Sequence, residues 1–442
     1  MIYLDHAAAT PVDKRVLEAM QPYFADQFFN PSAAYLPAKK VAADYEAAKA
    51  TIAHAIGAKS SDLVITAGAT EANNLAFTAI LREPVDDFLG TGSARPVDQR
   101  SPARRRFRTK DSSFVRPAPV AVVTGEPPLA TSVVTSGAPQ KISTDPRVLY
   151  LETEHDSIRA VATRYGDVSV KVLPNGLIDL EDLKTKITDE TELISVALVN
   201  NELGTIQPLA EIARLIRGIK LDRLKRGVKT QLLLHSDASQ ALNLLDINVA
   251  RLGVDLLTIN SAKIYGPKGV GALYVSHDAK LNPLTVGGGQ ENGLRSGTEN
   301  VPLVIGFAKA VEISKEHLNG NRKKYASWRK ILLSELKDYE IINKKHVLDN
   351  FVVLCYNGID AERLIFLLEE KGIYVATGAA CAASKGVRSH VLKAIGLSDA
   401  QIAGSLRISL GETNDETQIK EAARMINEVV KSEYERIGRD KR

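Results

Sequence analysis

The sequence predicts an α/β protein built on a mostly parallel sheet with helices on both faces, together with a smaller α+β domain. Segments typical of strands and segments typical of helices alternate through about two thirds of the 442 residues, as expected for parallel strands joined by helical crossovers. After about Lys315 this alternation stops. We therefore expect a large domain at 12–315 and a small domain formed by 1–11 and 316–442.

Five short apolar runs are predicted to be strands of the large sheet, at 62–66, 147–152, 193–199, 231–236 and 255–260. A helix is expected at 69–81, and another at 209–219, where Leu and Ile recur at helical spacing directly after Pro208. Ligands of such sheets bind at the carboxyl ends of the strands, so functional side chains should lie just after these runs.

The C-terminal third contains a different mixture of elements. The expected elements are a helix at 322–336, a strand at 351–356, a helix at 361–371, a strand at 405–410 and a helix at 415–437. Such a grouping is typical of an α+β domain.

The segment 84–146 interrupts the α/β pattern. It is rich in Pro, Ser, Thr, Gly, Ala and Arg and has no sustained periodicity, so we predict a disordered surface insertion with at most a short local strand at 120–123. Much of the net charge of +4 comes from arginines at 95–116. A basic run can bind nucleic acid, but a solvated loop is the commoner case, and we do not expect nucleic-acid binding.

Composition excludes several classes of protein. No stretch approaches the roughly 18 apolar residues of a membrane span, and the N-terminus lacks the features of a signal peptide, so we expect a soluble, cytoplasmic protein. The two cysteines, Cys355 and Cys381, allow neither a disulfide framework nor a metal site made of cysteines alone, and no metal is expected.

The two cysteines differ in their surroundings. Cys355 lies inside an apolar run and is predicted to be a buried strand residue. Cys381 lies among small residues typical of a mobile loop, where Lys385 or Arg388 would favour its reactive thiolate.

Lys263 is the strongest single candidate for chemistry. It follows the apolar run that ends at Asn260 and precedes a Gly-Pro turn. An amine held there would be partly desolvated, which lowers its pKa and makes it nucleophilic, as a Schiff-base lysine requires. Taken alone, an ordinary solvated loop lysine is the commoner explanation.

Two further features would complete a site for pyridoxal phosphate (PLP). Asp237 follows the apolar run at 232–234, where a buried carboxylate needs a cation such as a protonated ring nitrogen. The small residues at 66–71 open a predicted helix, whose free amides and dipole suit a phosphate. Each feature also has an ordinary structural explanation, but their order along one α/β pattern favours a PLP enzyme.

The sequence closely resembles the cysteine desulfurases of the class V aminotransferase family, which have the fold-type I architecture of PLP-dependent transferases. The matching motifs are YLDHAAATP at 3–11, NPS at 30–32, GATEANN at 68–74, TEH at 153–155, VNNELG at 199–204, HSDASQ at 235–240, NSAKIYGPKG at 260–269, GGGQE at 287–291, RSGTEN at 295–300, GAAC at 378–381 and LRISLG at 406–411. The segment 84–146 and a shorter expansion at 220–229 have no counterpart.

The resemblance implies a role for each matching residue. Lys263 would hold PLP as a Schiff base, Asp237 would pair with the ring nitrogen and His155 would stack on the ring. The implied contacts to the other cofactor atoms come from Ala69, Thr70 and Ser261 at the phosphate, from Gln240 and Asn201 on the oxygen side of the ring, and from Thr298 at the phosphate of a neighbouring subunit in a homodimer. Asn30 and Arg407 would bind the substrate carboxylate.

The activity implied by the resemblance is the conversion of L-cysteine to L-alanine. Lys263 would remove the α-proton, and Cys381 would attack the substrate sulfur and carry it as a persulfide. A sulfur-acceptor protein, either an iron-sulfur scaffold or a tRNA-thiolation enzyme, would then receive it for iron-sulfur cluster, thio-cofactor or tRNA biosynthesis. Two main departures from the family pattern are Ala262, where a phosphate-binding His is usual, and Glu412, where Arg is frequent. His6, Tyr35 and Asn292 also replace residues that are common in the family, Asn, His and Arg respectively.

Two alternatives remain open at this point. One is a PLP aminotransferase or selenocysteine lyase on the same fold, although a transaminase needs no thiol like that of Cys381. The other is a weakened scaffold that uses the insertion at 84–146 to bind a partner or RNA.

Overall fold

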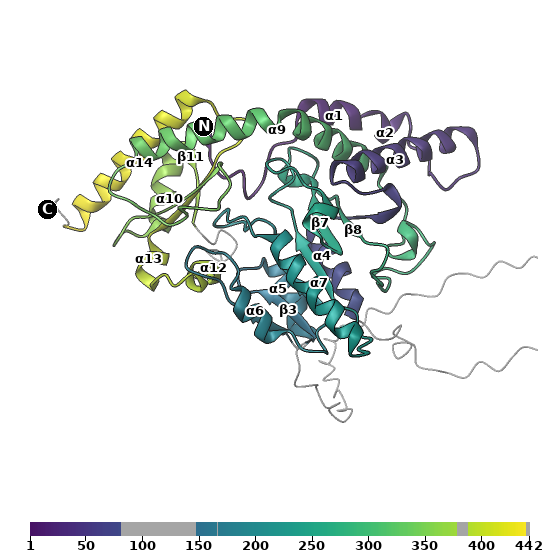
Figure 1. Ribbon diagram of the computed structural model, residues 1–442. Helices are drawn as coiled ribbons and strands as arrows, with labels where there is room; N and C mark the ends of the chain where they lie inside the picture. The colour runs from purple at the N-terminus through teal and green to yellow at the C-terminus, as the bar shows by residue number, and fades with distance from the viewer. Residues whose placement is uncertain (81–146, 166, 378–387, 439–442) are drawn as a thin grey trace, which may run out of the picture. The chain divides into compact units, whose positions relative to one another are not determined.

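The protein is described by a computed structural model that covers residues 1–80, 147–165, 167–377 and 388–438 (Figure 1). The predicted insertion at 84–146, the strand expected at 120–123 and Cys381 lie outside these residues. Within the described ranges, no helix is long and apolar enough to cross a membrane.

A seven-stranded sheet forms the centre of the predicted large domain. Its strands lie in the order β2 (Leu63–Thr66), β8 (Gly271–Val275), β7 (Leu256–Asn260), β6 (Leu233–Asp237), β5 (Leu193–Ser195), β3 (Val148–Leu151) and β4 (Asp167–Val170). Only β8 runs antiparallel to its neighbours. The prediction of a mostly parallel sheet with five of these strands is therefore confirmed.

Strands β8 and β4 were not predicted. The connection from Asn260 to Gly271 is too short for the dozen or more residues that a parallel crossover needs, so the chain folds back and β8 pairs antiparallel with β7. Two of the four residues of β4, Asp167 and Ser169, are polar, so the strand lacks a clear apolar run.

Alternating side chains of the strands enter two different cores. In β2, Leu63 and Ile65 belong to the core that includes residues of α3 (Leu36–Ala55) and α7 (Leu209–Lys225), whereas Val64 belongs to the core that includes residues of α4 (Ala69–Phe77) and α5 (Asp156–Ala162). Helices thus cover both faces of the sheet, as predicted. Because every second residue of a strand lies on the same face, Asp237 lies on the face of Leu233 and His235. This is the face that α4 covers.

A four-stranded sheet and a two-stranded sheet belong to the C-terminal part of the chain. The larger has the order β12 (Ala376–Thr377), β13 (Ser405–Ser409), β10 (Phe351–Cys355) and β9 (Glu340–Ile341), all antiparallel. The smaller pairs β1 (Ile2–Tyr3) with β11 (Ile373–Tyr374), so the N-terminal residues join this part of the chain. Cys355 is 1% exposed and its thiol is free, as predicted.

Helix α9 (Val301–Glu335) is longer than the helix predicted at 322–336 and runs through the predicted domain boundary at 315. It packs against α1 and α3 and against α14 (Glu416–Arg436) (Figure 1). Its first turns are buried on more than one side, at residues such as Val304, Phe307 and Ala308, so they show no clear amphipathic period. The remaining helices are α1 (Lys14–Met20), α2 (Pro22–Ala25), α6 (Leu180–Lys186), α8 (Val249–Leu252), α10 (Ala361–Glu370), α12 (His390–Ala394) and α13 (Asp399–Ala403).

Candidate active site

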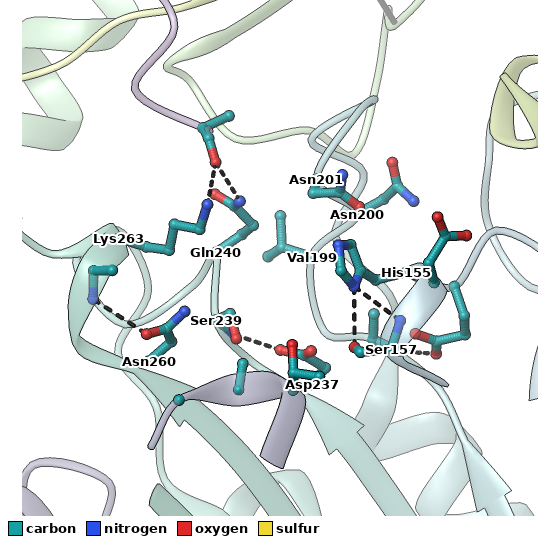
Figure 2. A pocket seen from close by; sticks show the side chains of 18 of the residues that line it. His155, Ser157, Val199, Asn200, Asn201, Asp237, Ser239, Gln240, Asn260 and Lys263 are labelled. Atoms are coloured by element: carbon teal, nitrogen blue, oxygen red, sulfur yellow. Dashed lines mark hydrogen bonds between the residues drawn. The ribbon is translucent and has the colours of Figure 1, made fainter. Parts of the chain in front are cut away.

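A cavity of about 790 Å³ opens where strands β2, β6 and β7 end. Its wall contains most of the residues that the sequence predicts for a cofactor and substrate site. These are Ala69, Thr70, His155, Asn201, Asp237, Gln240, Lys263 and Arg407. Figure 2 shows Lys263 and Gln240 on one side of the cavity, His155 on the opposite side and Asp237 below them.

Lys263 lies at the end of a short 3-10 helix (Ser261–Lys263) that directly follows β7. Its Nζ donates hydrogen bonds to the backbone oxygens of Ala7, at 2.9 Å, and Ala8. Gln240 Nε2 also donates to Ala7, at 2.9 Å. The motif at the N-terminus therefore forms the wall next to the lysine, although it is about 255 residues away in sequence.

Asp237 is the last residue of β6 and is 9% exposed. Its Oδ2 accepts a hydrogen bond from Asn73 of α4 at 2.8 Å, and its Oδ1 accepts one from the backbone of Ser239 at 2.8 Å. No lysine or arginine in the described part of the chain forms an ion pair with it. A buried carboxylate with neutral donors on both oxygens is well suited to a cation that a ligand would bring.

The N-terminus of α4 faces the same cavity. Gly68 precedes the helix with a φ of 143°, a conformation that L side chains rarely adopt, and it provides no side-chain cap for the first amides. Ala67, Gly68, Ala69 and Thr70 all line the cavity. The first-turn amides and the positive end of the helix dipole would therefore suit an anion.

His155 caps α5 on the opposite wall. Its Nδ1 accepts the N–H of Ser157 at 3.1 Å and lies 3.0 Å from the Ser157 hydroxyl. Since Nδ1 accepts a hydrogen bond, the neutral ring carries its proton on Nε2. The ring is thereby fixed at the cavity wall, where a flat ligand could stack on it.

Arg407 of β13 reaches the cavity from the C-terminal sheet and is 3% exposed. Its Nη1 donates to the backbone oxygen of Asn201 at 2.9 Å, and its Nη2 donates to Asp5 Oδ1 at 2.6 Å. Its Nε is buried and has no hydrogen-bond partner within the described ranges. The guanidinium is thus held in a fixed orientation at the cavity wall, as recognition of a carboxylate requires.

Three residues of the cavity wall with shifted pKa values had no predicted role. Burial, and next the charge of Asp237, raise the pKa of Glu154 to about 8. Burial also raises the pKa of Glu202 to about 7, although a hydrogen bond from Ser389 acts to lower it. Burial lowers the pKa of His390, whose Nε2 lies 3.0 Å from the backbone oxygen of Glu154.

The sequence offers only weak signals for these three residues. Glu154 precedes His155 within the TEH motif, and His390 follows Cys381 by nine positions. Neither signal indicates burial, which decides the state of ionisation.

Three predicted site residues do not line this cavity. Ser261 is fully buried, and its Oγ has no hydrogen-bond partner among the residues described. Asn30 is exposed and its Oδ1 accepts the N–H of Ser32 at 2.9 Å, while Thr298 is exposed near the start of α9. Cys381 lies outside the described ranges.

The two main departures from the family pattern also differ in position. Ala262 lines the cavity, and its backbone oxygen accepts the hydroxyl of Thr10 at 3.1 Å. Glu412 is not part of the lining; its carboxylate lies 3.1 Å from His317 Nδ1 and accepts the amide of Asn321 at 2.8 Å. Its negative charge is therefore partnered away from the cavity.

The cavity residues fit PLP in three respects. A lysine amine, a buried carboxylate lacking a cation and an open helix N-terminus face one space, and each matches a different part of the cofactor: the aldehyde, the ring nitrogen and the phosphate. By contrast, no group of three or more His, Cys, Asp or Glu side chains suited to a metal ion is present in the described ranges.

Comparisons with known proteins agree with this geometry. The family model described as aminotransferase class-V matches residues 2–89 and 123–421. Cysteine desulfurase IscS 1 of Archaeoglobus fulgidus is 34% identical over 424 residues, which cover 95% of this chain and 94% of the relative. A solved NifS-like protein is 26% identical with a TM-score of 0.76, covering 98% of this chain and 99% of that one.

A second solved structure, of SspA in complex with cysteine, is 29% identical with a TM-score of 0.69. It covers 93% of this chain and 99% of that one. Both the family model and the relative span far more than half of the sequence, so the predicted family and fold are confirmed. The chain belongs to the class V aminotransferase family and, within it, to the cysteine desulfurases.

Proposed function

We propose that this protein is a PLP-dependent cysteine desulfurase that converts L-cysteine to L-alanine and carries the sulfur as a persulfide on Cys381. The observation that supports this most is the arrangement of Lys263, Asp237 and Arg407 around one cavity. Family membership and the similarity to SspA in complex with cysteine support the same substrate.

Three residues would hold the cofactor at its reactive and ring positions. Lys263 would bind it covalently, Asp237 would keep its ring nitrogen protonated, and His155 would stack on its face. When bound, PLP supplies an electron sink that makes the α-proton of an amino acid acidic. The first turn of α4, with Ala69 and Thr70, would bind its phosphate.

Arg407 and Lys263 would act directly on the substrate. The oriented guanidinium of Arg407 would bind the carboxylate of L-cysteine, with Asn30 as a second ligand. Lys263 Nζ would then take the proton from the substrate α-carbon, because an amine in this cavity is within reach of a ligand held by Arg407.

Cys381 would provide the nucleophile. Its thiolate forms a new bond to the substrate sulfur as the carbon–sulfur bond of L-cysteine breaks, and the electron pair of that bond remains with the carbon skeleton. Protonation of that skeleton gives L-alanine, and the persulfide stays on the enzyme. A sulfur-acceptor protein, either an iron-sulfur scaffold or a tRNA-thiolation enzyme, would receive the sulfur.

The active unit in this proposal is a homodimer. Thr298 is exposed and outside the lining of the cavity of its own chain, which agrees with a role at the phosphate of the neighbouring subunit. Ser261 would support the phosphate of its own subunit.

The decisive experiment compares the wild-type protein with Cys381→Ser. Wild type should release alanine from L-cysteine and carry one extra sulfur on the Cys381 peptide by mass spectrometry, whereas the variant should lose both. A variant that released alanine and sulfide at the parent rate would contradict the role of Cys381 and favour a lyase.

Borohydride reduction tests the lysine independently. The pyridoxyl group should map to the peptide that contains Lys263, and no such adduct should form in Lys263→Ala. An adduct on any other lysine would overturn the assignment.

A further inference from the structure

Glu154 is a fully buried carboxylic acid in the wall of the cavity, with 0% of its surface exposed. Its Oε1 accepts the backbone N–H of Ala197 at 2.6 Å. Its Oε2 is buried and has no hydrogen-bond partner within the described structure. An ionised carboxylate rarely keeps one oxygen unpaired in such a place, because burial without compensation costs several kcal/mol.

The charged groups around Glu154 do not offset a negative charge on it. The charge of Asp237, another carboxyl group of the cavity lining, raises the pKa of Glu154 further, and the backbone N–H groups of Ala197 and His155, which lower it, contribute less. His390 makes its contact with the backbone oxygen of Glu154 rather than with the carboxyl group, and the ring of His155 is turned to Ser157. No lysine or arginine forms an ion pair with Glu154 among the residues described. A proton on the carboxyl group is therefore the favoured state.

Asp237 couples this proton to ligand binding. Asp237 has neutral donors on both of its oxygens, so its charge acts on Glu154 without compensation. A cation bound beside Asp237 would offset that charge and would attract the negative form of Glu154 as well. The two carboxyl groups would then share one cation, and the reason for Glu154 to keep its proton would weaken.

We propose that Glu154 is a second acid of the cofactor site, protonated when no cation lies beside Asp237 and more readily ionised when a protonated pyridine nitrogen binds there. This inference rests on the proposed function, because it takes the ring nitrogen of PLP as the cation. By linkage, cofactor binding releases the proton of Glu154, and ionisation of Glu154 strengthens binding by the same factor. Glu154 is thus a positioning residue that acts on the ring nitrogen together with Asp237.

The experiment counts protons during PLP binding to the full-length protein freed of cofactor. Calorimetric titrations at pH 7 in buffers of different ionisation enthalpy give the number of protons released. With a pKa of about 8, Glu154 is about nine tenths protonated at pH 7 before binding. Wild type should therefore release up to about 0.9 proton more than Glu154→Gln, whose neutral amide has none to release.

Glu152→Gln is the matched control. Glu152 lies two positions away but accepts the N–H of Val172 at 2.7 Å and is not part of the cavity lining. This control should release as many protons as wild type. Equal proton release by wild type and Glu154→Gln, with PLP bound to both, would overturn the inference and leave the proposed function intact.

Failure of the proposed function gives a different result, because wild type would then bind no PLP at all, and the inference would fall with it. Should Glu154→Gln not fold, infrared spectra of Glu202→Gln with and without PLP replace the comparison, because this change removes the band of the other carboxyl group with a raised pKa. The band of a protonated carboxyl group should be present without PLP and decrease when PLP binds. A band that is absent at the start, or unchanged by PLP, would contradict the inference.

Discussion

Arg407 is oriented before any substrate binds, because Asn201 and Asp5 each accept a hydrogen bond from one end of its guanidinium. Its positive charge is therefore carried by a planar group of fixed orientation at the cavity wall, which suits the carboxylate of a ligand. A lysine would keep the positive charge but could not bind Asp5, Asn201 and a carboxylate together. The shape of this side chain therefore matters as much as its charge.

We predict that Arg407→Lys raises the KM for L-cysteine roughly 10- to 100-fold, equivalent to about 1.4–2.8 kcal/mol, with a smaller effect on kcat. Steady-state measurement of alanine release checks this. Arg329→Lys is the control, because Arg329 is half-buried and donates to the backbone oxygens of Phe351 and Asn343, but lies outside the cavity lining. An unchanged KM in Arg407→Lys would remove Arg407 from the carboxylate site.

The raised pKa of Glu202 predicts how the free energy of unfolding depends on pH. Burial raises its pKa from 4.5 to about 7 in the folded protein, so between these values the folded state binds more protons than the unfolded state. The free energy of unfolding must therefore fall as the pH rises through this window, by up to about 3 kcal/mol from this residue. Above pH 7 the contribution of Glu202 is lost.

The measurement is urea unfolding of wild type and Glu202→Gln at pH 5 and pH 8. The urea midpoint of wild type should fall more steeply between the two pH values than that of the variant, which cannot ionise at this position. Equal pH dependence would show that Glu202 is not protonated in the folded protein at pH 5 to 7.

At the scale of elements, the backbone conformation at the N-terminus of α4 leads to a prediction about PLP binding. Gly68 has a φ of 143° with no atom within 4 Å of an added Cβ, so a side chain there would be limited by backbone strain rather than by space. Strain of this kind costs of order 1–3 kcal/mol. The amides of Ala69 and Thr70 would shift as the strain relaxed.

Gly68→Ala should therefore weaken PLP binding roughly 10-fold or more, measured by titration of the cofactor-free protein. The control is Gly218→Ala in the interior of α7, where an added Cβ also meets no atom within 4 Å and φ is ordinary. That change should leave PLP affinity unaltered and stabilise the helix by up to about 1 kcal/mol. Unchanged PLP affinity in Gly68→Ala would argue against this turn as the phosphate site.

At the scale of the whole molecule, the proposed homodimer predicts that each cavity uses Thr298 of the other subunit. A homodimer of Lys263→Ala chains should bind no PLP covalently. A homodimer of Thr298→Ala chains should bind PLP weakly at both of its sites. Mixed dimers of the two variants should regain one site of wild-type affinity, because that site has its own Lys263 and the partner subunit's Thr298. Mixed dimers that bind no better than Thr298→Ala would show that Thr298 acts within its own chain.

The sequence by itself determined the family, the mostly parallel sheet and the positions of most strands, because these depend on local apolar runs and on motifs of adjacent residues. Lys263, Asp237 and the turn before α4 could be predicted as a set, since parallel strands end at a common edge. The first turns of α9 and the antiparallel β8 were missed, because burial on several sides removes the amphipathic period and a short connection reverses the chain.

Only the tertiary structure decided the ionisation of the cavity and the partners of Arg407. Glu154 and Glu202 are ordinary glutamates in sequence, and burial raises the pKa of both. For Glu154 the charge of Asp237, 83 positions away, raises the pKa further. Likewise, Asp5 meets Arg407 across 402 positions. Burial and long-range charge pairs depend on the packing of distant segments, and no local pattern of residues records them.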